Sequence, residues 1–245
     1  MAHSGTPRQT QEPPRPAGPL LKICGLRQVD QAAAIAALAV DAIGVIGVAA
    51  SPRFVAPARR PSLFAAVREV SPACRRVLVV ADPDDADLEL LDPRHGHTLL
   101  QLHGGESPER CRELRRRCGC PVWKALRLRT PADLDQVEAY ADAADALLLD
   151  AWVPEQLGGT GQRIPLEWLA GIAMPLPWWL AGGINAGRVP AVLDCLSPDG
   201  LDASSSVERA PGDKDLALVR RLVSTVRDCA GARSCETGED HPSRD

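Results

Sequence analysis

The segment Leu20-Leu21-Lys22-Ile23-Cys24-Gly25 is the first apolar run of the chain. Later parts of the chain repeat its pattern of an apolar run followed by a helical segment. It follows a proline-rich leader, and the start of a helical pattern comes directly after its glycine. Successive side chains of a strand alternate between two faces, so Lys22 and Cys24 share one face and Leu21 and Ile23 share the other. In a barrel, we expect the first pair to point inward and the second pair to meet the outer helices.

Apolar strands and helical segments alternate along the rest of the chain. Strands are predicted at residues 20–25, 41–48, 76–81, 98–103, 121–126, 145–150, 176–181 and 200–203. Helices are predicted at residues 32–39, 57–70, 84–93, 107–118, 131–143, 165–171, 186–195 and 213–229. A helix between two buried strands is a β-α-β unit, which makes the strands parallel. The pattern predicts an α/β protein with a single closed (β/α)8 TIM barrel, and an open doubly wound sheet is the alternative.

The two ends of the chain have a different composition from the predicted barrel. Residues 1–19 hold several prolines among polar residues and show no apolar periodicity. Residues 231–245 are rich in Gly, Ser, Glu and Asp. Segments of this kind cannot bury enough apolar surface to fold. We therefore expect a disordered leader at 1–19, a barrel domain at 20–230 and a disordered tail at 231–245.

Composition excludes several classes of function. A net charge of −4 and a pI near 5.8 provide no basic field, so nucleic acid is not an expected partner. The sequence has no secretory signal and no apolar run of about 20 residues, so no membrane partner is expected. The eight cysteines show no paired Cys-x-x-Cys spacing, which indicates neither a metal site nor a disulfide framework. A cytoplasmic protein is predicted.

Two residues with reactive side chains stand at the ends of distant predicted strands. Cys24 ends the first strand and Asp150 ends the sixth. In barrels, the carboxyl ends of the strands carry the chemistry. Desolvation beside apolar walls raises the pKa of a carboxyl group and suits it to donate a proton, so the pair fits a base and an acid on opposite sides of a sugar. The alternatives are a small buried apolar residue at Cys24 and a structural carboxylate at Asp150.

The ends of the last two strands carry a pattern that favours phosphate binding. Gly182-Gly183 follows the seventh strand, and Ser204-Ser205-Ser206 follows the eighth. Bare glycine amides and serine hydroxyls can approach an anion, and barrels commonly hold phosphate in these loops. Either piece alone is explained by a tight turn with capping serines. Gly158-Gly159-Thr160-Gly161, after the sixth strand, is either a plain loop or a ligand clamp, with Gly159 as its candidate.

Two further side chains have two interpretations each, and a third has a structural one. Arg53, after the second strand, could hold a carboxylate or phosphate or be solvated. His103, at the end of the fourth strand, could orient a ligand or close the core. Lys22 points into the barrel, and Asp202 on the neighbouring eighth strand has the parity to meet it, so an interior ion pair is predicted.

At these positions the chain resembles the phosphoribosylanthranilate isomerase family. The matching segments are Lys22-Ile23-Cys24-Gly25, Asp41-Ala42-Ile43-Gly44, Ser51-Pro52-Arg53-Phe54-Val55, Gln101-Leu102-His103-Gly104, Leu148-Leu149-Asp150-Ala151, Gly158-Gly159-Thr160-Gly161, Leu180-Ala181-Gly182-Gly183-Ile184-Asn185, Ser204-Ser205 through Val207-Glu208, and Pro211-Gly212-Asp213-Lys214-Asp215. They occur in order from residue 22 to residue 215. A single segment is weak evidence, but the ordered set is specific.

The resemblance implies an Amadori rearrangement in tryptophan biosynthesis, without a metal or organic cofactor. N-(5-phosphoribosyl)anthranilate would become 1-(2-carboxyphenylamino)-1-deoxyribulose 5-phosphate, with Cys24 as general base and Asp150 as general acid. Arg53 would hold the anthranilate carboxylate. The loops at Gly182-Gly183 and Ser204-Ser205 would hold the phosphate of this small phosphosugar. The protein is expected to be a monomer or a homodimer.

Three positions depart from the family pattern, and they leave other functions open. The stretch 44–50, at the end of the second strand, lacks the usual aromatic residues, Ser206 replaces a usual glycine, and Gly105 replaces a common acidic residue. The alternatives are a related barrel isomerase for another aminoaldose phosphate and a non-catalytic barrel that binds a phosphate ligand. A thiol base must also spend time as thiolate, although free cysteine has a pKa of about 8.5. Lys22 could contribute to that stabilisation.

Overall fold

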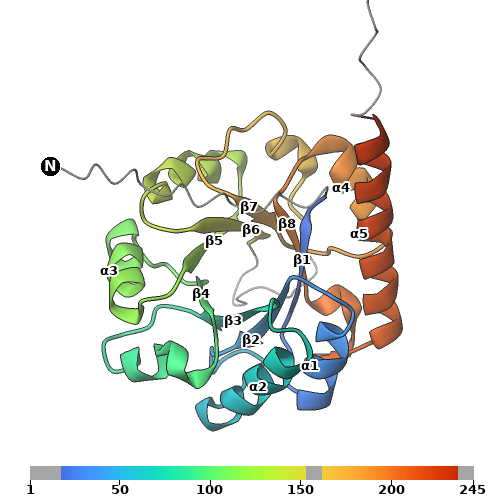
Figure 1. Cartoon of the computed structure of the whole chain (residues 1–245). Helices are drawn as coiled ribbons and strands as arrows, with labels where there is room; N and C mark the ends of the chain where they lie inside the picture. Colours follow the sequence, from blue (N-terminus) through green and yellow to red (C-terminus); the bar gives the residue numbers. More distant parts are fainter. Residues whose placement is uncertain (1–17, 153–161, 237–245) are drawn as a thin grey trace, which may run out of the picture.

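Eight parallel strands close into a barrel in this computed structural model, which describes residues 18–152 and 162–236 (Figure 1). The strands are β1 (Leu20–Cys24), β2 (Ala42–Ile46), β3 (Arg75–Val80), β4 (Leu99–Leu102), β5 (Val122–Leu128), β6 (Ala146–Ala151), β7 (Trp178–Leu180) and β8 (Gly200–Ala203). Each pairs in parallel with its neighbours in sequence, and β1 also pairs with β8. The closed barrel is confirmed, and the open doubly wound alternative is wrong.

Helical segments follow the strands and form the outer layer of the barrel (Figure 1). The α-helices are α1 (Val29–Ala36), α2 (Arg60–Val70), α3 (Pro108–Cys118), α4 (Val189–Cys195) and α5 (Leu216–Glu236). Short 3-10 segments are η1 (Pro57–Arg59), η2 (Leu88–Leu91), η3 (Pro93–His95), η4 (Pro131–Tyr140), η5 (Leu166–Trp168) and η6 (Ser205–Val207). In the described residues, no helix is long and apolar enough to cross a membrane.

Three of the predicted α-helices are 3-10 segments instead. The prediction of a helix at 84–93 is wrong because Asp84 turns the chain: its Oδ1 accepts hydrogen bonds from the amides of Ala86 (2.8 Å) and Asp87 (3.1 Å). Pro93 then lacks the amide hydrogen that a continuing helix would need. The segments at 131–143 and 165–171 are likewise η4 and η5. These connections shorten the outer layer without changing the barrel.

The carboxyl-terminal part of the chain also differs from expectation. The sequence predicts a helix at 213–229, whereas α5 begins at Leu216 and continues to Glu236. A small antiparallel hairpin, β9 (Glu208–Ala210) with β10 (Asp213–Lys214), precedes it and was not predicted. The rest of the predicted tail, and the leader up to residue 17, lie outside the described residues.

The barrel interior shows the strand alternation that the first segment predicts. Cys24 packs with the interior cluster, whereas Leu21 and Ile23 pack with the helices in the outer core. Trp123 and Trp179 fill the interior, with ring centroids 4.6 Å apart. Such packing makes the barrel a filled core rather than a pore, so ligands can bind only at its mouth.

The predicted interior ion pair is present. Lys22 Nζ lies 2.9 Å from Asp202 Oδ2, and the two residues are partners in the β1–β8 register. A buried charge is costly unless a partner compensates it, so the pair fixes both side chains under the mouth of the barrel.

Candidate active site

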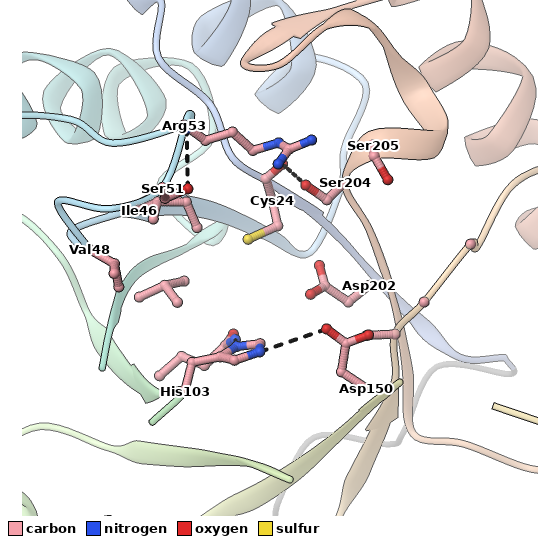
Figure 2. Close-up of a pocket in the computed structure, with 15 residues that line it drawn as sticks. Cys24, Ile46, Val48, Ser51, Arg53, His103, Asp150, Asp202, Ser204 and Ser205 are labelled. Carbon is pink, nitrogen blue, oxygen red and sulfur yellow. Dashed lines mark hydrogen bonds and ion pairs between the residues drawn. The ribbon is translucent and has the colours of Figure 1, made fainter. Parts of the chain in front are cut away.

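A cavity at the carboxyl ends of the strands collects nearly all of the predicted site residues (Figure 2). It is lined by Cys24, Arg53, His103, Asp150, Gly182, Gly183, Ser204 and Ser205, together with Ile46, Val48, Ser51, Val79, Gln101, Ala181 and Asp202. The predicted residue Gly159 lies outside the described residues. Segments from both ends of the chain therefore meet in one cavity.

Asp150 comes from the end of β6 and is nearly buried in the cavity. Its Oδ1 accepts a hydrogen bond of 2.9 Å from the Ala151 amide, and Oδ2 lies 3.7 Å from His103 Nε2. Burial raises the pKa of Asp150 to about 7, and the nearby Asp202 carboxylate adds to the rise. Asp150 can therefore hold a proton at neutral pH and release it to a ligand.

His103 faces Asp150 from the end of β4 (Figure 2). Burial lowers the pKa of His103 to about 3, with further lowering from nearby cations, so the imidazole is neutral at physiological pH. Gln101 Nε2 lies 2.9 Å from His103 Nδ1. When that amide donates to Nδ1, the ring hydrogen is on Nε2, which has no hydrogen-bond partner among the described residues. His103 is thus placed as a neutral donor toward the cavity.

Cys24 lies at the end of β1, beside Lys22 and across from Gly44 of β2. Burial raises the pKa of the Cys24 thiol. The ammonium groups of Lys22 and Lys214 act in the opposite direction, and the Asp202 carboxylate adds to the rise. Burial therefore disfavours formation of the thiolate that a base requires, and the two lysines favour it.

Gly44 leaves the space that the Cys24 thiol occupies. A Cβ atom at this position would lie 2.6 Å from Cys24 Sγ. We expect Gly44→Ala to displace the thiol and to lower kcat by about 10²-fold, because small misplacements of a catalytic group are costly. Turnover and thermal unfolding should be measured together.

A matched control for this substitution is Gly105→Ala. A Cβ atom at Gly105 would meet Asp82 Oδ1 at an ordinary contact distance of 3.7 Å. Its kcat should stay near that of the original protein. Equal kcat values for the two variants would show that the space beside the thiol is not critical.

Arg53 is held in place rather than solvated. Its Nε lies 2.9 Å from Glu208 Oε1 and its Nη2 lies 2.7 Å from Glu208 Oε2. The Arg53 side chain is only 9% exposed, and it lines the cavity beside Cys24. The interpretation of Arg53 as a merely solvated loop residue is therefore wrong.

The loop after β7 has the positive φ angles that its two glycines predict. Gly182 and Gly183 have φ angles of 84° and 65°, which favour glycine. A Cβ atom at Gly182 would lie 2.5 Å from the Gln162 carbonyl oxygen. The Ser206 hydroxyl donates to the Ile184 carbonyl and so joins the two loops. The departure at Ser206 therefore links the loops and does not line the cavity.

The wall contributed by the second strand and its neighbour is aliphatic. Ile46, Val48 and Val79 line this part of the cavity. The departure from the family's aromatic pattern therefore leaves an apolar surface against which a ring can pack.

Sequence reasoning did not assign roles to three polar residues near the cavity. Gln101 lines it, Glu208 holds Arg53 from behind, and Lys214 in turn holds Glu208. The parity of β4 places Gln101 on the same face as His103, and that signal was available in the sequence. In the described residues, no group of three or more His, Cys, Asp or Glu side chains is placed to hold a metal ion.

A thiol and a carboxyl group that share one cavity at the carboxyl end of a closed (β/α)8 barrel define the class of acid–base barrel enzymes. Residues 21–225 match the model of a family described as N-(5'phosphoribosyl)anthranilate (PRA) isomerase. The chain belongs to this family and is an isomerase of tryptophan biosynthesis. The fold and the enzyme class expected from the sequence are confirmed.

Individual relatives and solved structures agree with this assignment. The N-(5'-phosphoribosyl)anthranilate isomerase of Synechococcus sp. (strain JA-3-3Ab) is 46% identical over 207 residues, which cover 84% of this chain and 90% of the relative. That of Synechocystis sp. is 45% identical over 205 residues, covering 82% and 93%. The crystal structure of phosphoribosyl anthranilate isomerase from Thermus thermophilus is 32% identical with a TM-score of 0.69, covering 85% and 98%.

Proposed function

We propose that this isomerase converts N-(5-phosphoribosyl)anthranilate to 1-(2-carboxyphenylamino)-1-deoxyribulose 5-phosphate, with Cys24 as general base and Asp150 as general acid. The observation that carries the proposal is that both groups, 126 positions apart by residue number, line one cavity. Loops suited to a phosphate border the same cavity on the β7 and β8 side. The cavity thus offers a proton donor, a proton acceptor and an anion site.

The reaction needs one proton at the sugar ring and the loss of another at C2. Asp150 gives its proton to the ring oxygen as the C1–O bond breaks, and the nitrogen lone pair forms a C1=N bond. Cys24, as thiolate, removes the C2 proton. The electrons of that C–H bond form the C1=C2 bond of an enolamine as the π electrons of the C1=N bond return to nitrogen. Tautomerisation of the enolamine yields the ketone. The raised pKa of Asp150, about 7, lets this residue donate near neutral pH.

The substrate's charged groups have separate places in the cavity. We assign the phosphate to the backbone at Gly182-Gly183 and Ser204-Ser205. The support is the positive φ angles of the two glycines and the position of both loops on the cavity. We assign the anthranilate carboxylate to Arg53, because a guanidinium forms charge-assisted hydrogen bonds with carboxylates. His103 would donate from Nε2 to an oxygen of the sugar.

Arg53→Ala should chiefly raise KM. Loss of a hydrogen bond to a charged group costs about 1.5–3 kcal/mol, so KM should rise by roughly 10- to 100-fold. The change in kcat should be smaller, because the carboxylate is bound in the ground state and in the transition state alike. Steady-state kinetics measure both constants, and a KM equal to that of the original protein would contradict the carboxylate assignment.

A turnover assay with freshly generated phosphoribosylanthranilate tests the proposed function. The expected result is loss of the anthranilate-type fluorescence as the aminoketose forms. Turnover of a different aminoaldose phosphate, with none of phosphoribosylanthranilate, would favour the related isomerase. Binding of a phosphate ligand without any turnover would favour the non-catalytic barrel.

We also propose a cytoplasmic location and action as a monomer or homodimer on a free phosphosugar. A thiol base must stay reduced, and thiols stay reduced in cytosolic compartments. Sedimentation at several protein concentrations distinguishes the two oligomeric states.

A further inference from the structure

Behind Arg53, outside the ring of eight strands, lies a buried group of three charged side chains, which we call the Arg53–Glu208–Lys214 cluster. Glu208 and Lys214 are partners in the β9–β10 hairpin. Lys214 Nζ lies 2.7 Å from Glu208 Oε1, and the Arg53 guanidinium contacts both carboxylate oxygens of Glu208. The Lys214 side chain has no exposed surface, and that of Glu208 is 4% exposed. Charges this deeply buried are costly unless they are compensated, so the arrangement is specific.

The hairpin that carries Lys214 is itself fixed from two sides. The Gln31 side chain on α1 accepts a hydrogen bond of 2.9 Å from the Lys214 amide. Lys214 Nζ lies 3.2 Å from the Ser204 carbonyl oxygen, and the Ser204 hydroxyl donates to the Cys24 carbonyl over 3.2 Å. Lys214 therefore connects Arg53, through Glu208, with the loop after β8.

The formal charges of the cluster explain why a lysine is needed. Arg53 and Glu208 alone would form a neutral pair, which attracts a carboxylate only weakly. Burial lowers the pKa of Lys214, and the Glu208 carboxylate acts in the opposite direction. As an ammonium, Lys214 adds a second cation, so the cluster of two cations and one anion is positive overall. A buried positive charge next to the cavity attracts an anion in the cavity strongly, because little water screens the interaction.

We propose that Lys214 is a positioning residue for the isomerase reaction: through Glu208 it fixes the Arg53 guanidinium at the cavity, and its charge keeps this region positive for the substrate carboxylate and the Cys24 thiolate. The proposal rests on the roles proposed above for Arg53 and Cys24. It gives a function to the segment Pro211-Gly212-Asp213-Lys214-Asp215. This segment does not line the cavity itself, but it contacts residues near it.

The surroundings of Cys24 support the second part of the proposal. Charged groups act on this thiol from three elements: Lys22 on β1, Asp202 on β8 and Lys214 on β10. Arg53, His103 and Asp150 are the other charged or titratable groups that line the cavity. Lys22 is already paired with Asp202 at 2.9 Å, so Lys214 provides positive charge that this pair does not offset.

The test compares Lys214→Met and Lys214→Arg with a matched control, Lys124→Met. Lys124 is another buried lysine: its Nζ lies 2.6 Å from Glu106 Oε2 and 2.7 Å from the Gly104 carbonyl oxygen. Loss of Lys124 therefore breaks the same kind of contacts without changing the charge beside Cys24. Two quantities are measured: KM for phosphoribosylanthranilate, and the pH midpoint for alkylation of Cys24 by iodoacetamide, followed by mass spectrometry of its peptide.

Lys214→Met should raise KM by about tenfold and move the alkylation midpoint upward by about one pH unit. Lys214→Arg keeps the positive charge, so its KM and its alkylation midpoint should stay close to those of the original protein. Lys124→Met should lose stability but keep KM and the midpoint. If Lys214→Met loses stability to the same extent while KM and the midpoint stay unchanged, Lys214 is only structural and the proposal is wrong.

A second variant keeps the proposal testable if Lys214→Met does not fold. Glu208→Gln keeps the shape of the side chain but removes the anion between Arg53 and Lys214. Arg53 then loses its fixed position, so KM should rise, whereas the two remaining cations should move the alkylation midpoint downward. An unchanged KM would overturn the proposal. The alkylation experiment needs no turnover. If the original protein does not use phosphoribosylanthranilate but Lys214→Met still moves the midpoint upward, the proposed substrate is contradicted and the charge effect is not.

Discussion

Asp150→Asn is expected to lower kcat by about 10²–10⁴-fold, the range typical of a lost general acid. An asparagine preserves the size of the side chain, and its carbonyl oxygen can still accept the hydrogen bond from the Ala151 amide. It has no acidic proton for the ring oxygen. KM should change much less, because a proton donor acts mainly in the transition state. An unchanged kcat would exclude Asp150 as the acid.

The pH dependence of the original protein follows from the same group. The pKa of Asp150 is raised to about 7, mainly by burial. Its protonated form is the donor, so kcat/KM should fall as the pH rises above about 7. A variant that lacks the group should lose this alkaline limb together with most of its activity.

The substitution Asp150→Asn should raise stability at alkaline pH, although it lowers activity. A carboxyl group has a pKa of about 3.9 in the unfolded chain, so the folded state binds the proton more tightly. Its contribution to stability is complete below pH 4 and is lost as the pH rises through 7. Asp150→Asn removes this loss, so at pH 8 the variant should be more stable by a few kcal/mol, on the order expected for such a shift. Denaturant unfolding at pH 4 and pH 8 measures the difference.

Cys24→Ser should abolish most of the turnover, with an expected loss in kcat of about 10²–10⁴-fold. A hydroxyl occupies nearly the same place, but its much higher pKa prevents it from serving as the base. The neighbours Lys22 and Gly44 constrain the position equally in both proteins. The fold should therefore persist, and the loss should appear in kcat.

The control for this prediction is Cys195→Ser. Cys195 is an exposed free thiol at the end of α4, outside the cavity lining. Its variant should keep full activity and should still be inactivated by iodoacetamide. Survival of activity in Cys24→Ala or Cys24→Ser would remove Cys24 from the mechanism.

Features that depend on strand parity could be predicted from the sequence. The alternation of β1 correctly separates Lys22 and Cys24 from Leu21 and Ile23, because a one-residue step always changes the face. The Lys22–Asp202 pair followed from the same rule once β1 and β8 were neighbours. The ends of the strands in turn gathered the candidate residues, because all eight strands are parallel.

Features that depend on short or distant contacts could not be predicted. The β9–β10 hairpin has strands of three and two residues, too short for a periodic signal. Arg53 and Glu208 meet across 155 positions, and nothing local to either residue indicates the pair. The 3-10 segment at 88–91 arose because hydrogen bonds of Asp84 compete with helix formation, an effect that apolar periodicity does not register.

Closure of the ring has a consequence for how the protein is made. Lys22 and Asp202, like Cys24 and Ser204, come together across 180 positions. A chain still emerging from the ribosome carries Cys24 near its beginning long before its partners have been synthesised. Until the last strands dock, that sulfur lacks the Lys214 ammonium and the cavity walls around it. The thiol can therefore meet a substrate held in place only when the finished cavity surrounds it.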